Sequence, residues 1–168
     1  MVPRPDAAVT APDIGPAEFR QLLGRFATGV AVVTTLGPGD APAGMTASSL
    51  ASVSLQPPLV SVCIDHAAAI HRAILAAPAF VINILEESQE AISRRFAGEH
   101  PDRFDGIGYR VGERGLALLE GAHAWIECER HELVEAGDHT VVVGRVVGGE
   151  AGTGRPLLYY RGGYGTLG

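Results

Sequence analysis

Residues 45–60 read MTASSLASVSLQPPLV, and this segment is the most informative part of the 168-residue chain for predicting its fold. Hydroxyl-bearing residues lie among small apolar ones, and the run stops at Pro57 and Pro58 before a short apolar strand predicted over Leu59–Ile64. Serine and threonine hydroxyls donate and accept hydrogen bonds, and a concave run of backbone N–H groups attracts anions. The segment is therefore typical of a surface that lies against a flat polar ligand with a phosphate, although an ordinary serine-rich strand and turn has a similar composition.

Strands and turns dominate on both sides of this segment. β-Branched residues predict a strand over Val30–Leu36, which the turn Gly37–Asp40 joins to a second strand from Ala43 onward. Later strands are predicted over Phe80–Leu85, Ala124–Glu135, Thr140–Glu150 and, as the last one, Leu157–Tyr160. Most of the connecting turns are too short for a parallel crossover. The pattern predicts a mostly antiparallel β-barrel with two or three peripheral helices.

Three helices are predicted around these strands. The first begins at Gly15-Pro16 and ends at Gly29, and the other two cover Ala67–Ala77 and Glu86–Ala97. Residues 98–121 are expected to form a loop with one short strand inside it. The first helix carries an apolar stripe at helical spacing, made of Phe19, Leu22, Leu23 and Phe26.

Length and composition limit the class of protein. The chain is long enough for one domain, predicted over residues 15–168 after a disordered tail over residues 1–14. A net charge of -6 argues against nucleic acid or an anionic membrane as a partner. Cys63 and Cys128 form no disulfide framework, and no secretory signal or membrane-spanning run is present. These features together favour a cytoplasmic protein.

The familiar catalytic motifs are absent from the sequence. Gly106-Ile107-Gly108 lacks the full GxGxxG pattern and a preceding strand, and neither GxxxxGK[ST] nor GxSxG occurs. The six histidines show no metal-ligand spacing, so no metal site is predicted. His139 is the exception of interest, because it follows Asp138 at a turn between two strands, where an imidazole can reach a ligand. An ordinary polar turn would also explain this pair.

Segments along the chain resemble the flavin reductase family, the short-chain reductase components of two-component flavin-dependent monooxygenases. The resemblance covers about Phe19 to Tyr164 and rests on the order and spacing of its segments. These are FATGVAVVTT (26–35), TASS (46–49), SVS (52–54), PPLV (57–60), FVINIL (80–85), RFA (95–97), GDHT (137–140), GRV (144–146) and PLLYY (156–160).

This resemblance implies a split antiparallel Greek-key β-barrel of the FMN-binding type. It also implies a homodimer that binds FMN or FAD in a groove near the subunit interface, with NADH or NADPH as electron donor. Reduced flavin would then pass to a separate flavin-dependent monooxygenase. A non-catalytic flavin- or haem-binding module on the same barrel is the alternative.

The resemblance further implies which residues form the site. Thr46–Ser49 would lie along the ribityl chain and the isoalloxazine, and the residues after Ile64 would approach the phosphate. Asp138 and His139 are the expected catalytic pair, with His139 positioning the nicotinamide or its carboxamide. The expected flavin-binding residues are Thr46, Ala47, Ser48, Ser49, Ser52, Cys63, Asp65, Arg95, Phe96 and Tyr160.

One departure from the family concerns the phosphate. Ala68 and Ile70 stand where the family often places a serine and a threonine. Arg72 or backbone N–H groups would have to bind the phosphate instead.

Overall fold

The computed structural model describes residues 14–168, so the predicted tail lies outside the described residues except for Ile14. Among the described residues, seven strands form the main sheet in the order β3-β2-β6-β9-β10-β5-β4, and each neighbouring pair is antiparallel. Their bounds are Ala31–Leu36 (β2), Pro42–Ala47 (β3), Ala51–Leu55 (β4), Pro58–Asp65 (β5), Ala79–Ile84 (β6), Ala124–Ala136 (β9) and His139–Ala151 (β10).

Smaller elements surround this sheet. One side sheet joins β1 (Thr28–Gly29), β11 (Leu158–Tyr160) and β12 (Gly163–Gly165), and a hairpin pairs β7 (Tyr109–Val111) with β8 (Ala117–Leu119). The helices are α1 (Pro16–Leu23), α2 (His71–Ala76) and α3 (Glu90–Ala97), with short 3₁₀ turns at Pro38–Asp40 (η1) and Glu87–Gln89 (η2).

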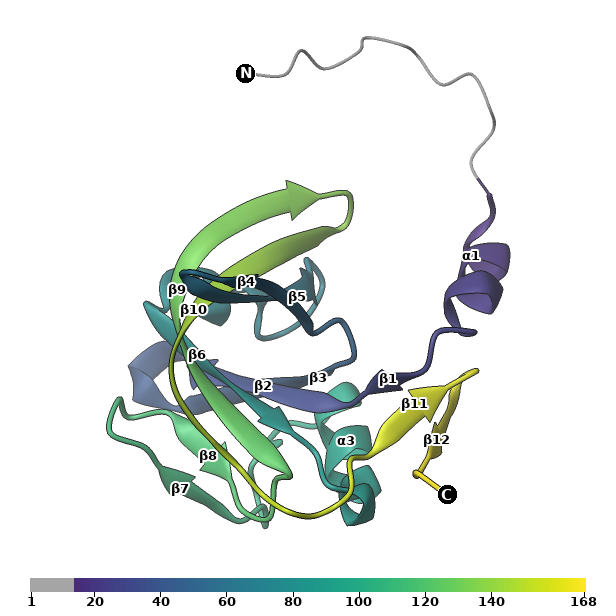
Figure 1. The fold of residues 1–168 in the computed structure, drawn as a ribbon. Helices are drawn as coiled ribbons and strands as arrows, with labels where there is room; N and C mark the ends of the chain where they lie inside the picture. The colour runs from purple at the N-terminus through teal and green to yellow at the C-terminus, as the bar shows by residue number, and fades with distance from the viewer. Residues whose placement is uncertain (1–13) are drawn as a thin grey trace, which may run out of the picture.

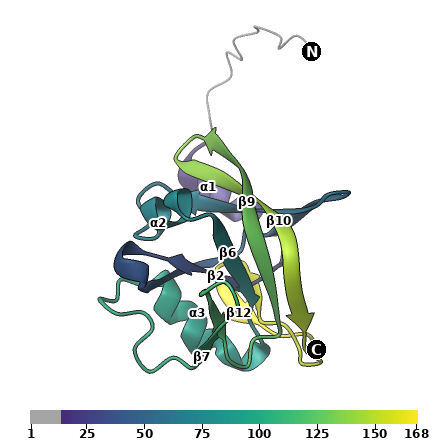
Figure 2. The ribbon, with the colours of Figure 1, turned by 90° about the vertical axis from the view of Figure 1, so that its left-hand side faces the viewer.

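The main sheet curls into a split antiparallel barrel, which confirms the predicted fold class. Figure 1 shows β9 and β10 as the longest hairpin, with α1 and the sheet of β1, β11 and β12 together on one side of the barrel. Figure 2, turned by 90°, shows α2 beside the upper part of the sheet and α3 beside its lower part.

The central strands β2 and β6 are buried on both faces. One core cluster contains Val33, Phe80 and Ile82, and a second contains Val32 and Leu85 on the other side. Strands covered on both sides carry continuous apolar runs, and this explains AVV (31–33) and FVI (80–82) in the sequence, while the buried Thr34 and Thr35 that follow in β2 bond backbone carbonyls. By contrast, β5 alternates between buried and half-buried residues, because only one of its faces meets the core.

The side chain of Asn83 joins the β7–β8 hairpin to strand β2 between the two core clusters. This side chain is fully buried, and its Nδ2 donates to the carbonyl of Val32 at 3.1 Å while its Oδ1 accepts from the Leu119 amide at 2.8 Å. The hydroxyl of Thr34 donates to the carbonyl of Ala117 at 2.7 Å, two residues before Leu119 on β8. Three elements distant in sequence are therefore held by two buried polar side chains with satisfied hydrogen bonds.

Several predicted boundaries are wrong for local reasons. The first helix ends at Leu23 rather than Gly29, because Gly24 caps it by donating to the carbonyls of Arg20 and Leu22, and Gly29 pairs with Leu158. The second helix begins at His71, since turns occupy residues 66–70. The segment 98–121 contains two paired strands instead of one, and β12 follows the strand predicted to be last.

The predicted apolar stripe on the first helix has no core partner within the described residues. The side chains of Phe19, Leu22, Leu23 and Phe26 are 53%, 56%, 52% and 73% exposed, respectively. In residues 14–168 no helix is long and apolar enough to cross a bilayer.

Candidate functional site

The pairing of β5 with β10 creates a half-buried surface opposite the core. His139 lies across from Asp65, Val141 from Cys63, and Val143 from Ser61. Directly opposite residues of an antiparallel pair share one face, and the residues between them, such as Val62, are buried in the core. We call the set Ser61, Cys63, Asp65, His139, Val141 and Val143 the outer face.

The serine-rich segment reaches this outer face through Ser49. The hydroxyl of Ser49 accepts from the Cys63 amide at 2.9 Å and lies 3.4 Å from the Cys63 carbonyl. Ser48 is exposed, and no hydrogen bond within the described part of the chain engages its side chain. The structure therefore brings Ser49 to the backbone of Cys63, and Cys63, Asp65 and His139 share the outer face.

The turn that carries His139 is held by polar contacts. The Nδ1 atom of His139 lies 2.7 Å from Oδ1 of Asp138, and the His66 amide donates to the Asp138 carbonyl at 3.0 Å. The hydrogen bond from His139, and then its charge, hold the pKa of the Asp138 carboxyl below its ordinary value. The contribution of the Asp138 carboxylate to this contact is therefore lost when the pH falls through its lowered pKa.

Three of the predicted residues near the serine-rich segment point elsewhere. The Thr46 hydroxyl donates to the Ser93 carbonyl on α3 at 2.7 Å, so this hydroxyl ties β3 to the helix. Ala47 is 7% exposed and belongs to the first core cluster. Ser52 is exposed on the edge strand β4 and lies across from Val60, on the opposite face from Cys63.

Arg95 and Phe96 have structural contacts of their own. The Arg95 guanidinium donates to the carbonyls of Arg103 at 3.0 Å and Asp102 at 3.1 Å, so it fixes the loop after α3. Phe96 is 1% exposed and packs edge-to-face on Phe104, with ring centroids 5.0 Å apart. Their direct contact with a ligand stays a prediction.

Tyr160 lies away from this group. It is 45% exposed on β11, in the three-stranded side sheet next to α1. Its part in a flavin site also stays a prediction.

A small cavity lies between β3, the loop after Asp65 and the loop after α3. Its volume is about 200 Å³, and its wall includes Gly44, Ala69, Ile70, His100 and Arg103. Ile70 is 1% exposed and also belongs to the first core cluster. The sequence reasoning missed His100 and Arg103, because a charged loop carries no periodic signal.

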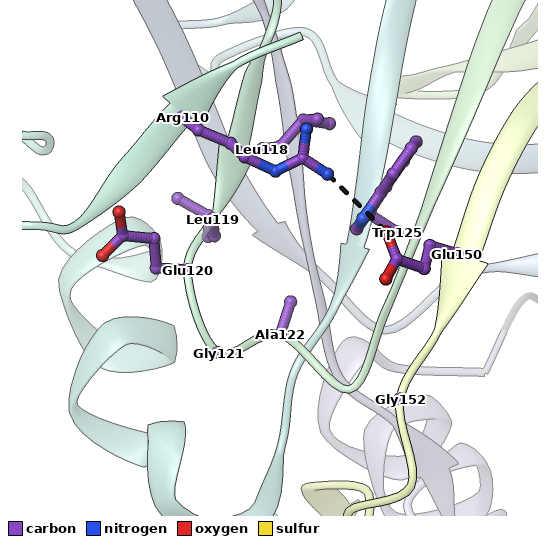
Figure 3. A pocket seen from close by; sticks show the side chains of 9 residues that line it. All are labelled: Arg110, Leu118, Leu119, Glu120, Gly121, Ala122, Trp125, Glu150 and Gly152. Atoms are coloured by element: carbon purple, nitrogen blue, oxygen red, sulfur yellow. Dashed lines mark ion pairs between the residues drawn. The ribbon is translucent and has the colours of Figure 1, made fainter.

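Two other cavities lie apart from the outer face. Arg72, which the sequence put forward for a phosphate, lines a cavity of about 530 Å³ together with Arg114 and Asp40. Figure 3 shows a cavity of about 300 Å³ beside Trp125, where Arg110 lies over the indole ring, 5.1 Å from its centroid. None of the predicted site residues lines the cavity of Figure 3. Among residues 14–168, no three His, Cys, Asp or Glu side chains gather in a way that could hold a metal ion.

Comparison with known proteins gives consistent matches over nearly the whole chain. The family model of the flavin reductase like domain matches residues 23–168. The chain is 40% identical over 163 residues to a flavin reductase of Pseudomonas putida, covering 95% of this chain and 94% of that protein. It is 42% identical over 154 residues to HsaB, the reductase subunit of a flavin-dependent monooxygenase of Mycobacterium tuberculosis, covering 90% of this chain and 82% of that protein.

A solved structure matches as well. The NADH:FAD oxidoreductase SgcE6 of Streptomyces globisporus C-1027, in complex with NAD and FAD fragments, superposes with a TM-score of 0.87 at 38% identity. The alignment covers 94% of this chain and 98% of that one.

The two thiols are expected to react differently with iodoacetamide. Burial raises the pKa of the Cys128 thiol to about 12, so its reactive thiolate is scarce, whereas Cys63 is partly exposed on the outer face. Mass spectrometry of the folded protein should show one alkylated cysteine, Cys63, and added FMN or FAD should slow that reaction.

The variant Cys63→Ala is the control and should take up no label while folded. Labelling of Cys128 at a rate similar to that of Cys63 would contradict the burial of Cys128. Absence of protection by flavin would contradict a flavin site on the outer face.

Proposed function

This chain belongs to the flavin reductase like domain family, and we propose that its outer face holds the flavin while His139 positions the nicotinamide. The protein is an oxidoreductase that uses NADH or NADPH to reduce FMN or FAD. The family match and the reductase relatives favour this function over the alternative of a non-catalytic flavin- or haem-binding module. The observation that carries the site assignment is the shared face of Cys63, Asp65 and His139, with Ser49 bonded to the backbone of Cys63.

The residues of the outer face fit a flavin. Ser61 and Cys63 have small side chains, so a planar ring can approach the strand closely. The free hydroxyl of Ser48 can bond the ribityl chain or the ring edge. The cavity beside Ala69 is lined by Arg103, whose guanidinium also donates to the carbonyls of Gly98 and Gly44 and would supply a cationic contact for the phosphate next to the loop after Asp65.

The flavin, when bound, supplies the acceptor for the hydride. The chain has to bring the nicotinamide into contact at the right angle, and orientation of this kind contributes much of the rate. His139 at the rim of the outer face is placed to hold the nicotinamide carboxamide, and Asp138 fixes the orientation of its imidazole. No proton has to be removed from the donor for hydride transfer, so His139 acts in binding and alignment.

We also propose that reduced flavin is released to a separate monooxygenase. HsaB is by name the reductase subunit of a flavin-dependent monooxygenase, and this chain covers 82% of it. The free thiols of Cys63 and Cys128 agree with a reducing compartment, and a cytoplasmic location is part of this proposal.

A homodimer is the oligomeric state that we propose. The end of α1 contacts the side sheet, because the Arg161 amide donates to the Gly24 carbonyl at 3.0 Å. The apolar side chains of α1 and Phe26 are exposed, and Tyr159 and Tyr160 on the side sheet are 37% and 45% exposed. A clustered apolar surface of this kind marks a protein interface. The partner proposed for this apolar surface is a second copy of the chain.

The function is tested by following NADH and NADPH oxidation at 340 nm with and without FMN, FAD or riboflavin. Oxidation is expected only with added flavin, and it should saturate with flavin concentration. Absence of turnover with every pair, despite measurable flavin binding, would favour the binding module.

Replacement of His139 by Ala tests the assigned contact. The KM for NADH is expected to rise about tenfold, because a charge-assisted or neutral hydrogen bond to the substrate is lost. The flavin KM should stay within about twofold of the parent value, because the lost hydrogen bond is to the nicotinamide and not to the flavin. His131→Ala, an exposed histidine on β9, is the control, and an equal loss of flavin binding in His139→Ala would refute the role.

The interface is tested with Leu22→Glu on α1. A buried carboxylate without a partner is strongly unfavourable, so this variant should run as a monomer in size exclusion with light scattering. Glu18→Gln on the same helix should remain dimeric, and a monomeric parent protein would overturn the proposed dimer.

A further inference from the structure

Four side chains outside the predicted site join the turn of His139 to the loop after Asp65. Glu135 lies at their centre: its Oε2 is 3.0 Å from Nε2 of His66, and its Oε1 accepts from the Thr140 hydroxyl at 3.0 Å. The Thr140 hydroxyl is also 3.0 Å from Nε2 of His71. The rings of His66 and His71 are 5.0 Å apart between centroids. We call these four residues the Glu135 cluster.

The β9–β10 register creates this cluster. Glu135 and Thr140 are direct partners across the two strands, and Thr140 also lies across from Ile64 of β5. Opposite residues on one face have Cβ atoms about 5 Å apart, which suits a hydroxyl and a carboxylate. Thr140 is fully buried, so its hydroxyl needs partners within the protein.

The hydrogen bonds of the cluster have a defined direction. The Thr140 hydroxyl donates its one hydrogen bond to Glu135, so it accepts a hydrogen bond from the Nε2–H group of His71. Both oxygens of the Glu135 carboxylate are then engaged, one by Thr140 and the other by His66. The cluster is complete without any further ligand.

The two histidines lie on either side of Ala67–Ile70, in the loop after Asp65. This loop is also joined to the turn through its backbone, because the His66 amide donates to the Asp138 carbonyl and Asp65 pairs with His139. The loop and the turn therefore form one connected unit, linked by backbone and side-chain contacts together.

We propose that Glu135 and Thr140 are positioning residues that couple flavin binding to NADH binding. The inference rests on the proposed function, in which the loop after Asp65 faces the flavin and the turn faces the nicotinamide. Flavin bound against the loop after Asp65 fixes the position of that loop. Because the Glu135 cluster joins the loop to the turn, the turn is fixed as well, and His139 is then positioned for NADH. Coupling of this kind is reciprocal, so NADH must tighten flavin binding by the same factor.

A purely structural role for the cluster would affect stability instead. The side chains of Glu135 and His66 are 70% and 39% exposed, and exposed ion pairs contribute little to stability. Replacement of Glu135 leaves His71 as a partner for the buried Thr140 hydroxyl, so the melting temperature is expected to change little while NADH binding is altered.

The test compares Thr140→Val with Thr35→Val. Both threonines are fully buried and donate one hydrogen bond, and Thr35, which bonds the Ala79 carbonyl at 2.9 Å, is outside the site. The KM for NADH at saturating flavin should rise about fivefold to tenfold in Thr140→Val, as for the loss of one or two hydrogen bonds, and should not change in Thr35→Val. Equal KM values in the two variants would overturn the proposal.

Glu135→Ala and Glu135→Gln provide a second test at an exposed position, where folding is not at risk. Glu135→Ala should reduce the effect of flavin on nicotinamide affinity, measured as the Kd for NAD⁺ with and without bound oxidised flavin. Glu135→Gln keeps an acceptor for Thr140 and should restore part of that effect. Full coupling in Glu135→Ala would refute the inference.

The same assays separate this inference from the proposed function. If the parent protein shows no flavin-dependent NADH oxidation, the proposed function fails. If the parent is active and the Thr140 and Glu135 variants match it in KM and coupling, only the coupling role fails.

Discussion

The register between β5 and β10 is the constraint on which the site depends. The pairing of Asp65 with His139 sends Cys63 and Val141 to the outer face and Val62 and Val142 into the core. A slip by one residue would exchange these two sets, placing imidazole and carboxylate in the core and valines at the surface. Burying those polar groups would be unfavourable, so the observed register is the stable one, and the arrangement of the site follows from that register.

The barrel supports this register from both sides. β10 is also paired along its length with β9, which pairs in turn with the doubly buried strand β6. Where β10 crosses the core, Gly144 leaves room for the Phe80 ring, since a Cβ there would lie 2.5 Å from Cζ of Phe80. The two long strands are thus fixed at their middle by packing and at their turn by the Glu135 cluster.

The sequence indicated the strand-rich part of this fold well and its local details less well. The ends of β9 and β10 were predicted within one residue, because the turn at Gly137 marks where two long extended segments meet. The end of α1 was missed, since the pairing of Gly29 with Leu158 depends on a distant strand. The same reason applies to the site: the bond of Thr46 to Ser93 and the contacts of Glu135 join segments whose proximity no local pattern encodes.

The buried amide of Asn83 has a consequence for the chemical ageing of the protein. Deamidation would turn it into an aspartate, which accepts hydrogen bonds only, so the bonds to Val32 and Thr34 would be lost and a charge would be buried. While the barrel is closed, this side chain is fully shielded from water. Deamidation at position 83 is therefore expected in molecules that have opened, and closing the barrel again would then carry the cost of a buried carboxyl group in place of two donated hydrogen bonds.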